Sequence, residues 1–351
     1  MTVRKGFTLF LVFAFTMSLL VLGFSMDKQT FALVLEAHRG KLLFACSLVL
    51  LMWALDGCKL IFLAKAAGEK LSFRLSMLLV WLNYFGCAIT PMQSGGGPFQ
   101  IYLLYKNGIS VGKGFAITLV RTLLTLFVLG LAFPVALLLQ PDLLQGHQYL
   151  KGFITYVLVL LMAIWGLVTL SLVRPGWIKR WARVGTLWLK RLGVVKPGKV
   201  LRIVRHIGRE IDVYNDNIRL FCTSGRKDLF YATLLAILQV VAQLSVLPCL
   251  IWAMGLPVEY LKALLLQALF LFLLYFVPTP GGSGAAEGGA AAVFRLLVPW
   301  NMAGLMAISW RFLTEYTGIL LGTWVALRYL GWNLAEQLMQ EKGQEDTVEG
   351  E

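Results

Sequence analysis

Residues 278–288, which read PTPGGSGAAEG, interrupt an otherwise apolar run in the second half of the chain. Proline lacks a backbone donor and glycine disfavours helix, so this segment ends any helix that enters it. A second interruption, at residues 90–98, reads TPMQSGGGP. Broken backbone at membrane depth is tolerated only where protein buries it or water reaches it. Each interruption therefore predicts a re-entrant helical hairpin, with the longer arms at 73–90 and 261–277. The alternative is that each longer arm crosses the membrane fully.

The composition places these hairpins in a membrane. Of 351 residues, 58% are hydrophobic and only 14% are charged, and the mean hydropathy is +0.75. A soluble domain is roughly 25% charged, and a helix needs about 20 apolar residues to cross a bilayer. We predict an all-α polytopic membrane protein, a single transmembrane domain over residues 1–330 with six full spans beside the two hairpins. The predicted spans are 7–25, 41–64, 113–139, 151–173, 229–254 and 303–330.

Charge sets the predicted orientation. The formal net charge is +14, and residues 174–227 hold 14 Lys and Arg against three acidic residues. Beside membrane spans, such a segment indicates a cytoplasmic loop under the positive-inside rule rather than a nucleic-acid site. Apolar residues at helical spacing within 200–221 predict an amphipathic helix, which either packs under the bundle or senses lipid. Both termini, including the acidic tail 331–351, are then cytoplasmic.

The two halves of the chain resemble each other. In each half a Thr-Pro pair is followed by glycines and, about 30 residues later, by an intramembrane arginine, Arg121 or Arg311. Each repeat, about 7–139 and about 151–330, has two spans, a hairpin and a third span, so the second must be inverted. Paired Pro/Gly-interrupted segments in corresponding halves indicate a transporter site. Each arginine lies eight residues into its span, about 12 Å deep at 1.5 Å per residue. Chance similarity between apolar segments is the alternative.

Charged residues at this depth define the predicted site. They are costly in lipid and should face the interior with a partner. We predict a polar cavity holding Arg121, Arg311, Glu287 and Glu315, suited to a phosphate-bearing headgroup because the guanidinium binds phosphate bidentately. The glutamates could take a cationic part of the headgroup or a proton. The alternative is that Arg121–Glu287 or Arg311–Glu315 are structural ion pairs. The other predicted substrate-binding residues are Gly95, Gly96, Gly97, Gln100, Thr279, Pro280, Gly281, Gly282, Ser283 and Gly284.

Other residues indicate structure more than chemistry. Asp56 and Lys59, spaced i, i+3, predict a structural ion pair. The motifs at Gly284-x-x-x-Gly288 and Gly318-x-x-x-Gly322 predict close helix packing. The three histidines lie in different segments and the five cysteines form no C-x-x-C, so we expect no metal site, disulfide framework or cofactor. The chain has no P-loop motif and no nucleophile elbow, so it is not expected to be an enzyme.

Both interruptions carry a family resemblance. The runs Thr90–Pro91 … Gly95–Gly96–Gly97–Pro98–Phe99–Gln100 and 278–288 resemble signatures of the flippase-like membrane domain of lysylphosphatidylglycerol synthase, the membrane half of the multiple peptide resistance factor, over residues 5–330. The resemblance implies a multi-pass protein of the bacterial or archaeal cell (inner) membrane that moves lipids with modified or charged headgroups between leaflets. Fused members carry an aminoacyl-transferase domain after the membrane part, an activity not expected here.

The resulting hypothesis is a flippase for an anionic or headgroup-modified (aminoacylated or glycosylated) phospholipid or a polyprenyl-phosphate lipid. Expected partners are these lipids and no nucleic acid, with a homo-oligomer or a partner synthase possible. There are two alternative hypotheses. In the first, the protein is a membrane-embedded enzyme or an accessory subunit of a lipid-linked glycosyl or aminoacyl transferase pathway, with Glu287 as a base. In the second, it is a non-transporting scaffold that recruits a partner to the basic loop.

Overall fold

A computed structural model describes residues 3–25, 36–139 and 225–329, together with positions 159, 162 and 166. The predicted span 151–173 apart from those three positions, most of the basic loop 174–227 with its amphipathic helix, and the tail 331–351 lie outside the described residues.

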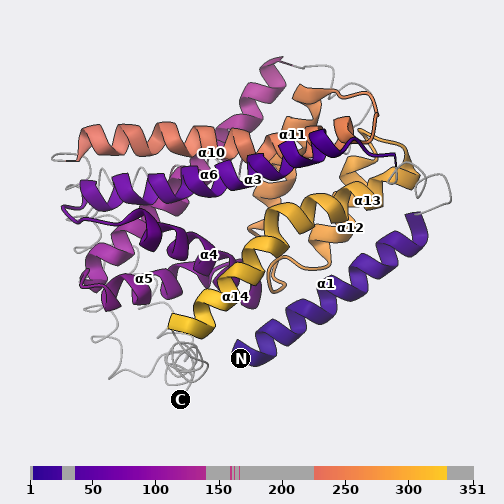
Figure 1. Ribbon diagram of the computed structural model, residues 1–351. Coiled ribbons are helices and arrows are strands. Elements are labelled where there is room, and N and C mark those ends of the chain that lie inside the picture. The colour runs from indigo at the N-terminus through magenta and orange to yellow at the C-terminus, as the bar shows by residue number, and fades with distance from the viewer. Residues whose placement is uncertain are drawn as a thin grey trace, which may run out of the picture.

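The described residues fold into helices and connecting turns without a β-strand, which confirms the all-helical prediction (Figure 1). The helices are α1 (Val3–Ser25), α3 (Arg39–Ala66), α4 (Phe73–Ile89), α5 (Gly96–Lys106), α6 (Val111–Leu139), α10 (Arg226–Ala253), α11 (Tyr260–Leu274), α12 (Ala285–Phe294), α13 (Trp300–Arg311) and α14 (Thr317–Tyr329), with a π-helical turn, η2 (Phe312–Tyr316), between the last two.

Three described helices are long and apolar enough to cross a membrane: α3, α6 over Val111–Leu131, and α10. Shorter apolar helices cover Ala14–Gly23, Phe73–Ile89 and Tyr260–Leu274. Large apolar side chains also cover the outside of the bundle, with Phe15, Leu43 and Phe230 each 67–70% exposed. A water-facing surface rarely carries so many exposed apolar groups, whereas a lipid-facing one requires them.

The two interruptions break the helices where the sequence predicts. In the first, α4 ends at Ile89 and α5 begins at Gly96; in the second, α11 ends at Leu274 and α12 begins at Ala285. The predicted span 303–330 differs from expectation, because the turn η2 divides it into α13 and α14. Single π-helical turns inside α-helices are frequent at functional sites.

The tips of the two interruptions meet. Pro91 and Pro280 form an isolated antiparallel β-bridge. Two backbone hydrogen bonds flank it, from the Met92 N–H to the Val277 carbonyl at 3.2 Å and from the Gly281 N–H to the Thr90 carbonyl at 3.3 Å. We call this contact, between residues 90–92 and 277–281, the tip bridge. It joins segments that lie in opposite halves of the sequence.

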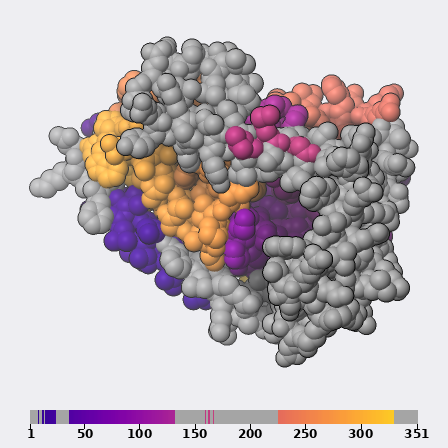
Figure 2. Space-filling model, turned by 180° about the vertical axis from the view of Figure 1, so that it is seen from behind, coloured from indigo at the N-terminus to yellow at the C-terminus, as the bar shows by residue number. Residues whose placement is uncertain are grey.

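Packing pairs come in matched sets across the two halves. The pair α4 and α5 corresponds to α11 and α12, and the pair α5 and α6 corresponds to α12 and α13. Crosswise, α4 packs on α14 while α11 packs on α6, and the central pair α3 and α10 joins the halves. In Figure 2, orange segments of the second half lie against purple and magenta segments of the first. Exchanging the halves therefore reproduces these pairs, whereas the contacts of α1 with α4, α12 and α13 have no counterpart among the described residues.

Small residues let α14 approach α4 closely. A Cβ on Gly322 would lie 2.0 Å from the Trp81 carbonyl oxygen, and one on Gly318 would lie 2.9 Å from the Tyr84 ring. The packing role predicted for this glycine pair is confirmed. The same prediction of close helix packing is wrong for Gly288, where a Cβ would meet no atom within 4 Å.

Candidate functional site

A cavity of about 270 Å³ lies beside the tip bridge. Its walls come from α3, α4, α5, α6, α10, the turn η2, residues 92–94 of the first interruption and Tyr275 at the end of α11. The polar side chains that reach it include Asp56, Asn83, Gln93, Arg121, Gln239 and Glu315. Polar groups from both halves of the chain therefore converge on one space inside an apolar bundle.

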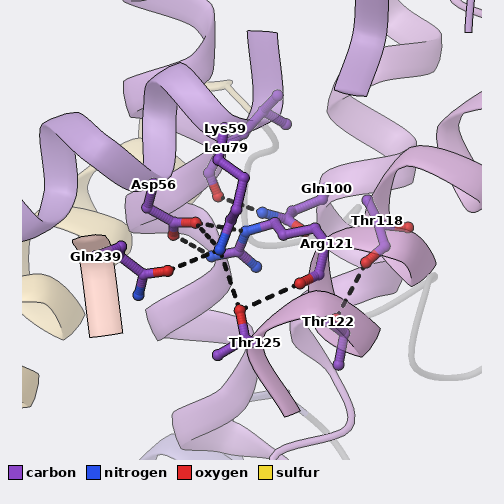
Figure 3. A network of polar contacts seen from close by, with 9 residues as sticks. All are labelled: Asp56, Lys59, Leu79, Gln100, Thr118, Arg121, Thr122, Thr125 and Gln239. Atoms are coloured by element: carbon purple, nitrogen blue, oxygen red, sulfur yellow. Dashed lines mark hydrogen bonds and ion pairs between the residues drawn. The ribbon is translucent and has the colours of Figure 1, made fainter. Parts of the chain in front are cut away.

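Arg121 is anchored on one wall of the cavity by Asp56 (Figure 3). Its Nε lies 3.1 Å from Asp56 Oδ1, and its Nη2 donates to Oδ2 of the same carboxylate. Arg121 is 8% exposed and Asp56 4%, so both charges are nearly removed from solvent. This two-pronged geometry is the strongest form of an arginine–carboxylate pair. It leaves Nη1 of Arg121 without a hydrogen bond to any described residue.

Lys59 completes this cluster from the next turn of α3. Its Nζ lies 2.9 Å from Asp56 Oδ1, which confirms the predicted pair. The same ammonium donates to Gln239 Oε1 at 2.7 Å and to Thr125 Oγ1 at 3.0 Å. Asp56, Lys59 and Arg121 together carry one net positive charge, so this wall of the cavity favours an anion.

Arg311 belongs to a second cluster, in the other half of the chain. It is 1% exposed, with Nε 3.6 Å from Glu287 Oε1 and Nη2 donating to the Gly281 carbonyl at 2.6 Å. Glu287 is fully buried and accepts from the Gly284 N–H at 2.7 Å and from the Tyr316 hydroxyl at 2.6 Å. Arg311 thus ties α13 to the tip of the second interruption and to the start of α12.

The ion pairs differ from the predicted alternatives. Arg121 pairs with Asp56 rather than Glu287, and Arg311 pairs with Glu287 rather than Glu315. Glu315 lies on the π-helical turn, four residues after Arg311. It reaches the cavity and makes no hydrogen bond or ion pair within 4.0 Å to a described residue.

The other predicted site residues divide between lining the cavity and shaping the tips. Gly97 lines the cavity. The Gly95 N–H binds Thr90 Oγ1 at 2.7 Å, and a Cβ on Gly96 would lie 2.1 Å from Asn83 Oδ1, so both glycines permit close contacts. Gln100 is buried and donates to the Leu79 carbonyl at 2.8 Å, away from the cavity lining.

The second interruption is held by its own short contacts. Thr279 Oγ1 donates to the Ser283 carbonyl at 2.9 Å, and Ser283 Oγ donates to the Pro280 carbonyl at 2.8 Å. Gly281, Gly282 and Gly284 have φ of 62°, 66° and 85°. This left-handed backbone is the reason that glycine is needed there. These residues shape the tip rather than line the cavity.

Sequence reasoning missed most of the neutral polar lining. Asn83, Tyr84, Gln239, Gln243 and Tyr275 all reach the cavity. Gln239 and Gln243 lie one turn apart in the apolar helix α10. This pair could have predicted a polar cavity from the sequence, because a buried amide needs a partner. Within the described residues, no group of three or more His, Cys, Asp or Glu side chains could hold a metal ion.

Comparison with known proteins agrees with this architecture. The family model described as "Lysylphosphatidylglycerol synthase TM region" matches residues 9–322. The chain belongs to this family. It is also similar to a UPF0104 membrane protein of Archaeoglobus fulgidus, at 23% identity over 239 residues, 68% of this chain and 71% of the relative. The protein is therefore a membrane protein, and the resemblance in the two interruptions extends over nearly the whole chain.

Proposed function

We propose that this protein moves anionic lipids between the two leaflets of the cell membrane. The observation that carries the proposal is the cavity: a polar space with an arginine on its wall, inside a bundle whose outer surface is apolar. A charged headgroup cannot cross hydrocarbon without a large desolvation cost, and such a cavity replaces its water. At about 270 Å³ the cavity suits a headgroup, while the acyl or prenyl chains stay in lipid.

The lipid phosphate binds at Arg121 in this proposal. Asp56 occupies Nε and Nη2 of the guanidinium, so the phosphate meets Nη1. The net positive charge of Asp56, Lys59 and Arg121 supports an anion at this wall. Arg311 lies behind the tip bridge, bound to Gly281, so a phosphate reaches it only after the tips separate.

The tip bridge is the gate of the proposed transporter. It consists of one β-bridge and two flanking backbone hydrogen bonds, a contact small enough to open and reform. Met92 and Gln93 beside it have φ of 54° and 52°, a left-handed backbone that non-glycine residues rarely adopt. Such strain favours a second arrangement of the tip once the bridge opens.

The proposed topology has six full spans and two re-entrant hairpins, with inverted repeats and cytoplasmic termini in the inner membrane. The matched packing of the two halves supports the repeat. The meeting of the interruptions inside the bundle supports hairpins, because each broken backbone is covered by the other. We also propose transport rather than catalysis, with membrane lipids as the partners.

Reconstitution tests the proposal directly. The purified protein is placed in vesicles containing fluorescently labelled phosphatidylglycerol, and dithionite quenching measures movement between leaflets. We expect movement well above that in empty vesicles, and about tenfold or more slower with Arg121→Gln, since a charge-assisted phosphate contact contributes about 1.5–3 kcal/mol. Arg295→Gln is the matched control, because Arg295 is exposed and packs over Trp300 outside the cavity. Movement equal to that in empty vesicles would refute transport of this lipid class.

A further inference from the structure

The cavity contains more neutral hydrogen-bonding groups than the binding of a phosphate requires. Beyond Arg121 and Asp56 it is lined by four carboxamides, from Asn83, Gln93, Gln239 and Gln243, and by the phenol of Tyr275. Tertiary contacts do not use these groups: apart from Gln239 Oε1, their side-chain polar atoms form no hydrogen bond to a described residue. Amides left free in an apolar bundle are costly unless a ligand or water meets them.

The pattern of donors and acceptors in the cavity indicates which kind of ligand group binds these amides. Gln239 gives its oxygen to Lys59, so only its NH₂ group remains for a ligand, as a donor. Glu315 makes no hydrogen bond or ion pair within 4.0 Å to a described residue, and its carboxylate offers only acceptors when ionised. A ligand group that bridges the two must accept from one and donate to the other.

A hydroxyl has this character, and an ammonium does not. A hydroxyl carries one donor and two acceptor lone pairs, while an ammonium carries three donors and no acceptor. An ammonium beside Glu315 would leave the NH₂ groups of Gln239, Gln243 and Asn83 without an acceptor. A bare phosphate would accept from the amides but would face the carboxylate of Glu315 as a like charge.

We propose that this cavity binds a hydroxyl-bearing headgroup, such as a glycerol, inositol or hexose unit attached to the lipid phosphate. The phosphate lies at Arg121, and the hydroxyls lie between Glu315 and the carboxamides of Asn83, Gln93, Gln239 and Gln243. This inference rests on the proposed lipid transport and specifies its substrate class. A site built to bind hydroxyls discriminates strongly against analogues that lack them, because its polar groups are then left unpaired.

The first test compares headgroups on identical chains. Vesicles contain labelled phosphatidylglycerol, phosphatidylinositol, phosphatidylethanolamine or phosphatidic acid, and inter-leaflet movement is measured for each. We expect the two hydroxyl-bearing lipids to move at least about tenfold faster than the other two. Equal movement of phosphatidic acid, or faster movement of phosphatidylethanolamine, would overturn the hydroxyl assignment while leaving transport standing. Movement of none above empty vesicles would instead refute the proposed function.

Variants locate the effect in the cavity. Gln243→Leu removes a donor and an acceptor at similar volume, and Glu315→Gln removes the anionic acceptor. We expect each to lower the ratio of the phosphatidylglycerol rate to the phosphatidic acid rate about tenfold. The control for the second variant is Glu259→Gln, because Glu259 is an exposed carboxylate paired with Lys262 outside the cavity. An unchanged ratio in both cavity variants would contradict the proposal.

A binding measurement tests the hydroxyl site without requiring lipid movement between leaflets. The full-length protein in detergent is heated with glycerol 1-phosphate, phosphoethanolamine or inorganic phosphate, since a ligand that binds only the folded state raises the Tm. We expect glycerol 1-phosphate to raise the Tm most and Gln243→Leu to abolish that excess. A shift no larger than that with inorganic phosphate would show a phosphate site alone and would overturn the proposal.

Discussion

Pro91 and Pro280 face each other in an antiparallel β-bridge, although they belong to opposite halves of the chain. Each lies in a segment where proline and glycine end a helix. Broken backbone in an apolar bundle leaves polar groups that need partners, and here each tip supplies partners for the other. The same contact closes one side of the polar cavity, because Met92, Gln93 and Ser94 continue from it into the cavity wall.

If the tip bridge is a gate, locking it should stop transport. Opposed residues in an antiparallel pair have Cα atoms about 4.5–5.5 Å apart, within the range that a disulfide spans. In a protein whose five native cysteines are replaced, Pro91→Cys with Pro280→Cys should cross-link on oxidation and abolish lipid movement, and a reductant should restore it. Each single cysteine variant is the control and should be insensitive to oxidant. Full movement in the cross-linked protein would show that the tips need not separate.

Asp56 should matter more for stability than Arg121. Replacing Asp56 by Asn leaves Lys59 and Arg121 as two buried, like charges, whereas Arg121→Gln leaves Asp56 paired with Lys59 at 2.9 Å. Breaking a buried pair and leaving a charge uncompensated costs about 3–5 kcal/mol. We therefore expect Asp56→Asn to lower the Tm in detergent clearly more than Arg121→Gln does. Equal losses, or a greater loss for Arg121→Gln, would mean that Lys59 does not compensate Asp56.

The sequence predicts the helix breaks because proline and glycine act locally. It also locates the buried charges, since an ionisable residue inside an apolar run is conspicuous. It does not give their partners: Asp56 and Arg121 are 65 positions apart in different helices, and the choice between them depends on tertiary packing. The choice of Glu287 rather than Glu315 as the ion-pair partner of Arg311 depends on tertiary packing in the same way. The contact between the tips is likewise a property of two distant segments.

The approach of α14 to α4 should not tolerate a side chain at Gly322. A Cβ there would lie 2.0 Å from the Trp81 carbonyl oxygen, which belongs to the backbone of α4 and cannot rotate away. Overpacking of this kind costs about 1–3 kcal/mol. Gly322→Ala should therefore lower the Tm, measured by thermal unfolding in detergent.

Gly288 provides the matched control for this substitution. It also lies in a helix, α12, but a Cβ there would meet no atom within 4 Å. Alanine is favoured over glycine in a helix by about 1 kcal/mol, so Gly288→Ala should leave the Tm unchanged or raise it. A loss of stability at Gly288 equal to that at Gly322 would contradict the close approach as the cause.

The hydroxyl of Tyr316 should stabilise the second charged cluster. It donates to Glu287 Oε1 at 2.6 Å, on a carboxylate that is fully buried and whose other oxygen accepts from the Gly284 N–H. A hydrogen bond to a charged group contributes about 1.5–3 kcal/mol, and Tyr316→Phe removes it at nearly constant volume. We expect a lower Tm for this variant and no change for Tyr105→Phe, because the Tyr105 side chain is 59% exposed. A Tm unchanged by Tyr316→Phe would show that Arg311 and the Gly284 N–H alone suffice to hold Glu287.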